Sequence, residues 1–271
     1  MHPENPDVLF AASWNRIRNT QESIVEGDDA KIWRTTDGGD TWEMLQNGLP
    51  QQDMCRIGLT ISNEKVFAVY VNTNYELDNV YVSSDNGDSW AATAGNAGAI
   101  LGGFGWYFGK VVVNPTNDDH IYVLGVDLHR SLDGGQTWEL ATPSWWSYSV
   151  HADKHSLHFS DANTLILATD GGLYRSTDNA ETWTDIENIP NTQFYRVAYN
   201  PHNPSVYGAG AQDNGITAGN ADIMNEWPRI LGGDGFQMIY HPTDPNIFYA
   251  ENHNGASYVT TDGGFDFSYA N

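Results

Sequence analysis

Short apolar runs separated by turn residues recur along the whole chain, with little sustained helical periodicity between them. The runs follow clusters of Pro, Asn, Asp and Gly, which end strands and favour turns. The tract 76–82 is too short to distinguish a helix from a strand by periodicity. The pattern as a whole predicts an all-β fold of short strands.

Six of these apolar strands follow a turn of similar composition, which indicates a repeated unit. The turns and the strands behind them are 2–6 with 8–11, 62–64 with 66–69, 114–117 with 121–123, 160–163 with 165–167, 200–204 with 206–207, and 241–245 with 247–249. We expect each unit to run strand, turn, strand, loop, strand, aspartate turn, strand. Repeats of about 40–50 residues built from strands are typical of propeller blades.

A second motif, Ser/Thr-x-Asp-x-Gly-x-Thr/Ser-Trp, recurs in phase with the units. Its aspartates are Asp37, Asp85, Asp133, Asp178 and Asp262. The gaps are 48, 48, 45 and 84 residues, so one copy is missing before the last. The fourth copy has Ala180 in place of Gly, and the fifth has Asp266 and Phe267 in place of the hydroxyl residue and Trp. Asp and hydroxyl side chains bond backbone N–H groups in turns, and Gly supplies a positive φ. We therefore interpret these aspartates as structural.

This motif resembles the Asp-box, or BNR repeat, of sialidases, xyloglucan-active glycosidases and sortilin-type Vps10 propellers. The whole chain resembles bacterial BNR-repeat proteins of the sortilin-like and "glycosyl hydrolase" kinds, with support from 170–176, 212–215 and 232–236. The resemblance implies an all-β propeller of four-stranded blades, about six in this chain, forming one domain over 1–271. It places the boxes at the blade periphery. Because sortilin-like propellers are larger, we expect a fragment of a longer protein, located extracellularly, at the cell surface or in the periplasm.

Charge and cysteine content exclude several functions. The chain has 12 Lys and Arg against 35 Asp and Glu, a formal charge of −23, which repels nucleic acid and anionic membrane surfaces. A single cysteine excludes an intrachain disulfide and a Cys-rich zinc module. No run of 18 apolar residues exists, so we expect no membrane insertion.

Aromatic residues outside the boxes are candidates for ligand binding. They are Trp106, Tyr107, Trp145, Trp146 and Tyr148, and the polar residues Asn252 and His253 join them as candidates. Aromatic faces can stack on sugars and bind organic cations. The same aromatics can instead fill gaps between blades, and both interpretations remain open.

Three alternating polar residues, His151, Asp153 and His155, are candidate ligands for Zn²⁺ or another divalent metal. On a strand they would point to one face. No fourth ligand is evident, and a hydrogen-bonded histidine pair that fixes the strand is the alternative. Calcium in the acidic turns is a separate possibility. No cofactor is certain.

Aspartates outside the boxes are candidate catalytic acids and bases. Asp213 and Asp234 lie in glycine-rich surroundings that allow close approach of a ligand, and Asp170 is a third case. Two carboxylates can act as acid and base in glycoside hydrolysis, whereas turn formation is the alternative. A sialidase needs several arginines for the substrate carboxylate, but Arg34, Arg130 and Arg175 each precede a box, which indicates structural use.

The sequence favours an extracytoplasmic module that binds a glycan or a peptide at the channel face of a propeller. One alternative is a glycoside hydrolase of the xyloglucanase-like kind that uses Asp213 and Asp234. A second alternative is a structural repeat of a larger surface protein.

Overall fold

The structure is a computed structural model that describes residues 1–62, 65–95, 98–147, 149–187, 189, 191–223 and 227–270. Strands dominate these ranges, with two 3₁₀ turns, η1 (Trp145–Ser147) and η2 (His253–Gly255). The described ranges contain no α-helix, and they contain no helical segment of the length and apolarity needed to cross a membrane. The predicted all-β class is confirmed.

Within the described residues, five antiparallel sheets have four strands each, in sequential order. Their strands are β6 Ile57–Ser62, β7 Lys65–Val71, β8 Leu77–Ser83 and β9 Ala91–Ala92; β10 Lys110–Asn114, β11 Asn117–Leu124, β12 Leu128–Ser131 and β13 Glu139–Leu140; β14 Lys154–Phe159, β15 Leu165–Thr169, β16 Gly172–Ser176 and β17 Thr184–Asp185; β18 Arg196–Asn200, β19 Asn203–Ala211, β20 Gly215–Asn220 and β21 Arg229–Leu231; β22 Met238–Tyr240, β23 Phe248–Asn252, β24 Ala256–Thr260 and β25 Ser268–Tyr269.

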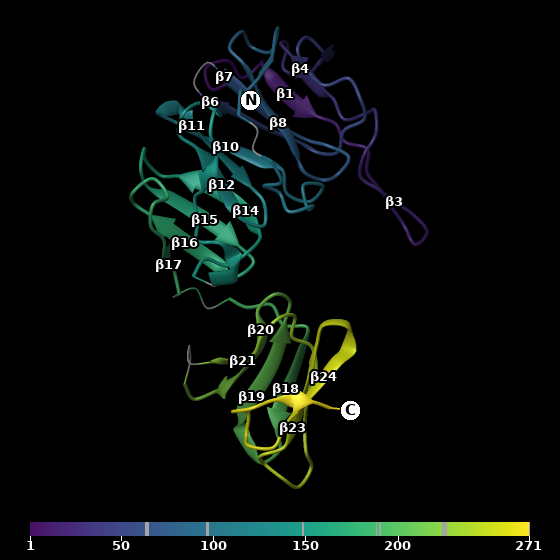
Figure 1. Cartoon of the computed structure of the whole chain (residues 1–271), viewed down its shortest axis with the longest axis vertical. Coiled ribbons are helices and arrows are strands. Elements are labelled where there is room, and N and C mark those ends of the chain that lie inside the picture. Colours follow the sequence, from purple (N-terminus) through teal and green to yellow (C-terminus); the bar gives the residue numbers. More distant parts are fainter. Residues whose placement is uncertain are drawn as a thin grey trace. The chain divides into compact units, whose positions relative to one another are not determined.

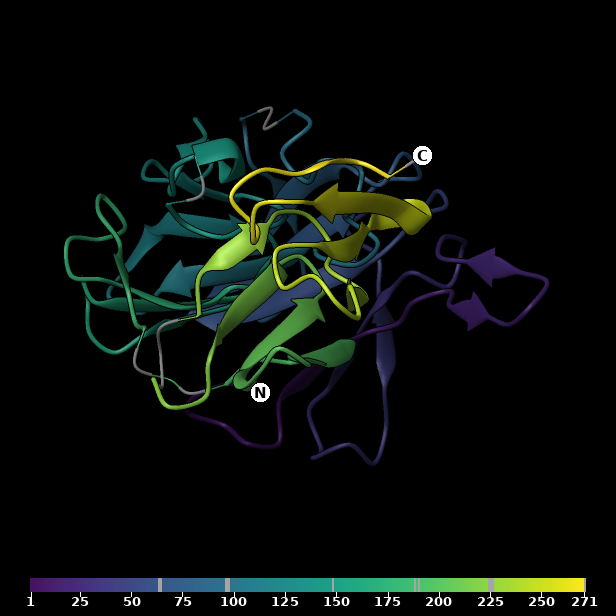
Figure 2. The same cartoon turned by 90° about the horizontal axis from the view of Figure 1, so that it is seen from below.

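A further sheet, the first along the chain, has three strands, β1 (Leu9–Ala12), β4 (Ile32–Thr35) and β5 (Glu43–Leu45). The hairpin of β2 (Ile17–Arg18) and β3 (Ser23–Ile24) lies between its first two strands and projects from it (Figures 1 and 2). Successive four-stranded meanders are the blades of a propeller. The prediction of a propeller-type fold with about six blades is confirmed.

The chain divides into two compact units, residues 1–187 and 188–271. Unit 1 holds the first four sheets, and unit 2 holds the sheets β18–β21 and β22–β25. The expectation of one domain over 1–271 stays a prediction.

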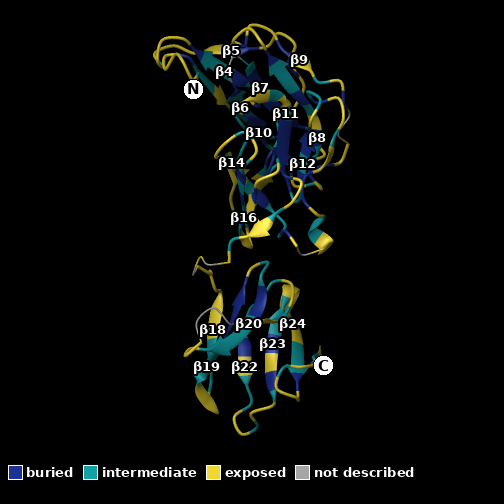
Figure 3. Ribbon diagram, turned by 90° about the vertical axis from the view of Figure 1, so that its left-hand side faces the viewer, coloured by how far each residue is buried: buried dark blue, intermediate teal, exposed yellow. Residues whose placement is uncertain are grey.

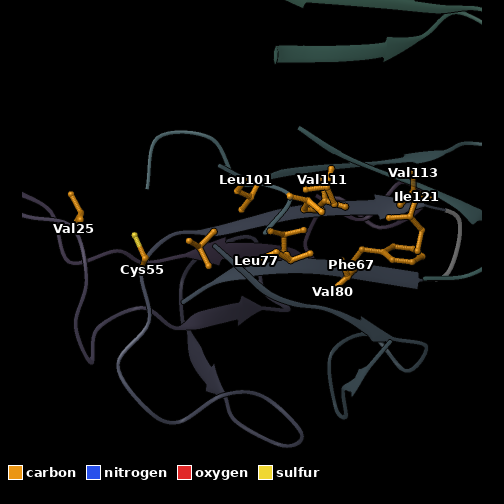
Figure 4. Close-up of a cluster of buried hydrophobic side chains, with 13 residues drawn as sticks. Val25, Cys55, Phe67, Leu77, Val80, Leu101, Val111, Val113 and Ile121 are labelled. Carbon is orange, nitrogen blue, oxygen red and sulfur yellow. The ribbon is translucent and has the colours of Figure 1, made fainter. Parts of the chain in front are cut away.

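The cores lie between successive sheets of each unit, and burial concentrates in the strands (Figure 3). The nearly continuous apolar run of β7 is explained by the two cores between which this strand lies. Phe67 lies in one core cluster with Val111 of the next sheet (Figure 4), and Val69 belongs to the same cluster. Ala68 and Tyr70 belong instead to the core shared with the first sheet. A strand buried on both faces needs apolar residues at every position.

The five aspartate turns, 35–42, 83–90, 131–138, 176–183 and 260–267, connect the last two strands of their sheets. These are the third and fourth strands in the four-stranded sheets, as predicted, and β4 and β5 in the three-stranded sheet. In the third turn the Ser131 hydroxyl donates to Asp133 Oδ1 at 2.7 Å, and the Thr137 hydroxyl donates to Oδ2 at 2.6 Å. The Thr137 N–H also donates to Oδ1 at 2.9 Å. These donors lower the pKa of Asp133 to about 2. The carboxylate of such a turn therefore accepts its hydrogen bonds from donors of the same turn.

Three details differ from the expectation or refine it. Trp42, Trp90, Trp138 and Trp183 immediately precede the last strand of their sheets and do not start it. Ala180 adopts the φ of 70° that glycine was expected to supply, and its methyl group is buried in the core. The sheet β18–β21 is a unit without a motif copy, which accounts for the gap of 84 residues.

Candidate ligand-binding face

The order of the strands determines which loops lie at the end of each sheet opposite to its aspartate turn. In the four-stranded sheets, first strands begin, and second strands end, at the end opposite to the aspartate turns, because neighbouring strands are antiparallel. In unit 1 this end carries many of the predicted site residues. We call residues 104–110, 151–156 and 170–171 the loop face of unit 1.

A β-bulge positions His155 on the loop face. Lys154 pairs with Thr169 and Ser156 pairs with Ala168, so His155 is the extra residue of its strand. Bulges change the direction of a side chain. The Nε2 atom of His155 lies 2.5 Å from Oδ1 of Asp170, directly after β15. The bulge therefore creates a His–Asp pair that links the start of β14 to the β15–β16 turn.

The predicted metal ligands do not alternate along one strand, because β14 begins only at Lys154 and Asp153 has a φ of 63°. That premise of the sequence analysis was wrong. Asp153 nevertheless lies beside Asp170, because their carboxylate oxygens are within 4.8 Å of each other. The ring of His151 lies against Gly171, where a Cβ atom would come within 2.4 Å of it.

Burial, followed by the charge of Asp170, raises the pKa of Asp153, and the charges of His151 and His155 oppose this effect. The structure thus adds Asp170 as the fourth polar group beside the predicted three. Imidazole and carboxylate suit Zn²⁺ and related ions. Metal binding by His151, Asp153 and His155 stays a prediction.

Lys154 is a buried charge that sequence analysis missed. Its Nζ atom donates to the carbonyl oxygens of Val126 at 3.1 Å and His151 at 2.5 Å. The side chain is fully buried, and burial lowers its pKa to about 8. Lys154 thus ties the segment before β14 to the β11–β12 connection, directly next to His155 in the chain.

Two predicted sets of residues meet at His155. The ring of Tyr107 lies edge-on to the imidazole with centroids 5.8 Å apart, and the ring of Phe108 lies 5.6 Å from it. The rings of Trp106 and Tyr107 have centroids 5.6 Å apart. Phe108 is buried, whereas half of Tyr107 is exposed. Trp106 and Phe108 thus support a Tyr107 surface that is open to a ligand.

A cavity of about 200 Å³ lies between the neighbouring first strands β6, β10 and β14. Its lining includes Gly58, Lys110, Leu124 and His155. Lys110 Nζ donates to the carbonyl oxygen of His155 at 2.6 Å, so a cation, an imidazole and apolar walls converge there. A concave site with a few polar groups is typical of ligand binding.

The second aromatic stretch forms η1. The rings of Trp145 and Trp146 stack with centroids 3.6 Å apart. The backbone N–H of Trp145 donates to Asp127 Oδ1 at 3.0 Å. Trp146 is largely exposed. Tyr148 lies outside the described residues. The tryptophan pair presents an aromatic face suited to stacking.

Unit 2 brings the other predicted residues together. The Asp213 N–H donates to Asp234 Oδ1 at 2.8 Å, and His253 Nε2 lies 3.3 Å from Asp234 Oδ2. Asn252 donates to the Gly232 carbonyl oxygen at 2.6 Å. Both oxygens of Asp234 therefore have polar neighbours within the unit. Catalysis by Asp213 and Asp234, and ligand binding by Asn252 and His253, stay predictions.

No family model and no curated protein matches the chain. It is similar to solved structures at low identity. A structure of "YCF48 bound to D1 peptide" shares 15% identity at a TM-score of 0.40, over 89% of this chain and 74% of that one. The GH74 xyloglucanase from Xanthomonas campestris shares 15% identity at a TM-score of 0.47, over 100% of this chain and 44% of that one.

The GH74 enzyme from Niastella koreensis shares 13% identity at a TM-score of 0.45, over 99% of this chain and 49% of that one. This chain thus spans less than half of each GH74 structure. These likenesses are too distant to indicate an activity, and the propeller-type blades are established by the sheets of the chain itself.

Proposed function

We propose that the chain is an Asp-box propeller module that binds a glycan or a peptide at the loop face of unit 1. The observation that carries the proposal is the convergence of half-exposed Tyr107, the His155–Asp170 pair and Lys110 beside one cavity. An open aromatic ring offers apolar contact, and the polar groups orient a ligand.

The aspartate turns support the Asp-box part of the proposal. In each turn that retains a hydroxyl residue before Trp, that hydroxyl donates to the aspartate Oδ2, as Thr41 does to Asp37 at 2.5 Å. These turns lie at the opposite end of the sheets from the loop face, which leaves that face free for binding. The location outside the cytoplasm is part of the same proposal and rests on the resemblance to Asp-box proteins.

Glycan and peptide arrays test the proposed function, followed by calorimetry on the strongest ligand. Tyr107→Ala should weaken that binding roughly tenfold, because contact with an exposed aromatic ring contributes about 1–1.5 kcal/mol. Tyr199→Ala is the matched control, since Tyr199 is similarly exposed on β18 of unit 2. A Tyr107→Ala protein that melts like the wild type and keeps full affinity would contradict the assignment of the loop face.

A second candidate function is glycoside hydrolysis in unit 2. The direct contact of the Asp213 backbone with the Asp234 carboxylate favours it, because it brings two predicted catalytic residues together. Reducing-sugar release from xyloglucan and related polysaccharides is the assay. Asp213→Asn and Asp234→Asn should each abolish hydrolysis, and activity that survives both changes removes these residues from any catalytic role.

A further inference from the structure

Two cationic side chains lie near each other at the starts of neighbouring first strands. Arg56 immediately precedes β6, and Lys110 begins β10. The guanidinium of Arg56 donates to the Tyr107 carbonyl oxygen and lies over the Trp14 ring at 5.6 Å. Lys110 lines the cavity and donates to His155. Both side chains are half-buried and are held in place by backbone oxygens.

Among the described residues, no carboxylate forms an ion pair with Arg56 or Lys110, whereas Arg130 pairs with both Glu139 and Glu181. Asp170, the acid of the loop face nearest in the fold to His155, pairs with that imidazole.

Electrostatics makes this arrangement unfavourable without a partner. Burial lowers the pKa of both groups, and the charge of Arg56 further lowers that of Lys110. Fully buried charges are normally paired, and 35 acidic residues against 12 basic ones give this chain ample carboxylates for pairing even partly buried ones. An anion beside both cations would remove their repulsion and supply the missing partner.

We propose that Arg56 and Lys110 form a subsite for the carboxylate group of the ligand, beside the cavity between β6, β10 and β14. Arg can bind a carboxylate through two parallel N–H bonds, and Lys adds a point charge with free donors. A cavity of about 200 Å³ has room for a small part of a ligand, such as one sugar ring or one amino-acid side chain. Trp14 supplies aromatic surface against Arg56, and Tyr107, whose carbonyl oxygen accepts from Arg56, supplies a second aromatic side chain.

This inference rests on the proposed function and specifies its ligand as one that carries a carboxylate. The same chemistry has two sources, the uronic acid of an acidic glycan and the C-terminus of a peptide. Both ligands are anionic, and the overall charge of −23 on the protein repels them. Their attraction to the subsite therefore depends on the local cations and weakens as the salt concentration rises.

Calorimetry with paired probes tests the subsite. The glycan arm compares hexagalacturonate with its methyl ester, and the peptide arm compares hexapeptide libraries with free and amidated C-termini. The wild type should bind the free acid of one arm at least tenfold more tightly than the blocked form. That arm identifies the source of the carboxylate.

Variants assign the effect to the two cations. Arg56→Gln and Lys110→Gln should each weaken binding of the free acid at least tenfold and reduce its salt dependence. Lys110→Arg keeps the charge and should remain within about threefold of the wild type. Arg18→Gln, which removes an exposed cation from β2, is the control and should bind as the wild type does.

The outcomes separate the subsite from the proposed function. Equal binding of free and blocked probes, or folded Arg56→Gln and Lys110→Gln variants with unchanged affinity, overturns the subsite and leaves the ligand-binding function in place. Failure of the folded wild type to bind these probes and every neutral glycan and peptide of the arrays overturns both. Melting temperatures establish folding, because Lys110 also donates to His155.

Discussion

Removal of the Arg130 guanidinium should loosen the contact between the third and fourth sheets of unit 1. Arg130 lies on β12 with its side chain only 5% exposed. Its Nη1 atom donates to the Asn179 carbonyl oxygen at 2.6 Å in the next aspartate turn. Its Nε atom bonds Glu139 at 2.8 Å, and Nη2 bonds Glu181 at 2.5 Å.

The magnitude follows from the exposure of these partners. The Glu139 and Glu181 side chains are 57% and 61% exposed, so water screens both ion pairs to about 0.5 kcal/mol each. The bond to the Asn179 carbonyl oxygen adds about 1 kcal/mol. Arg130→Met keeps the apolar stem and should therefore reduce the free energy of unfolding by about 2 kcal/mol.

Urea denaturation measures this loss as a lower midpoint with an unchanged m-value. Arg175→Met is the matched control, because Arg175 has the same place before its aspartate turn but is exposed. The control should stay within about 0.5 kcal/mol of the wild type. If Arg130→Met is as mild as Arg175→Met, the interpretation of Arg130 as a clamp between sheets is refuted.

Three further changes test the core, the turns and the buried lysine. Leu167→Ala, at a fully buried site between the third and fourth sheets, should cost about 2–5 kcal/mol in urea denaturation, and Ile166→Ala on the other face of β15 should cost clearly less. Asp178 has its pKa lowered to about 2 by Thr182 and Ser176. Its stabilisation is present above the unfolded pKa near 3.8 and is lost as pH falls to about 2, so Asp178→Asn should be destabilising in thermal melts at pH 7 and lose that deficit at pH 2; a constant deficit would contradict this. Lys154 has its pKa lowered from 10.5 to about 8, so the unfolded chain holds the extra proton between these values. The wild type should gain roughly 2–3 kcal/mol relative to Lys154→Met as pH rises from 8 to 10.5, and parallel pH profiles would refute the burial of a charged lysine.

The aspartate turns and the sheet order could be predicted from the sequence because their chemistry is local. Thr35, Asp37 and Thr41 lie within seven residues and bond one another, so their spacing specifies the turn. The burial of β7 on both faces likewise follows directly from its continuous apolar run.

The loop face could be predicted only in part, because its contacts depend on packing between distant segments. Sequence selected Tyr107 and His155 separately, but their contact requires β10 and β14 to lie together. Asp170 joins His155 through a bulge that the residue alternation does not encode. Arg56 and Lys110 are 54 positions apart, and only the packing of β6 beside β10 makes them neighbours.

Hydrogen–deuterium exchange with and without a bound ligand tests the loop face most directly, because it locates binding without a substitution. Saturating ligand from the array or probe experiments should slow exchange in 104–110 and 153–156 and leave the aspartate turns unchanged. Protection confined to the aspartate turns or to unit 2 would contradict ligand binding at the loop face.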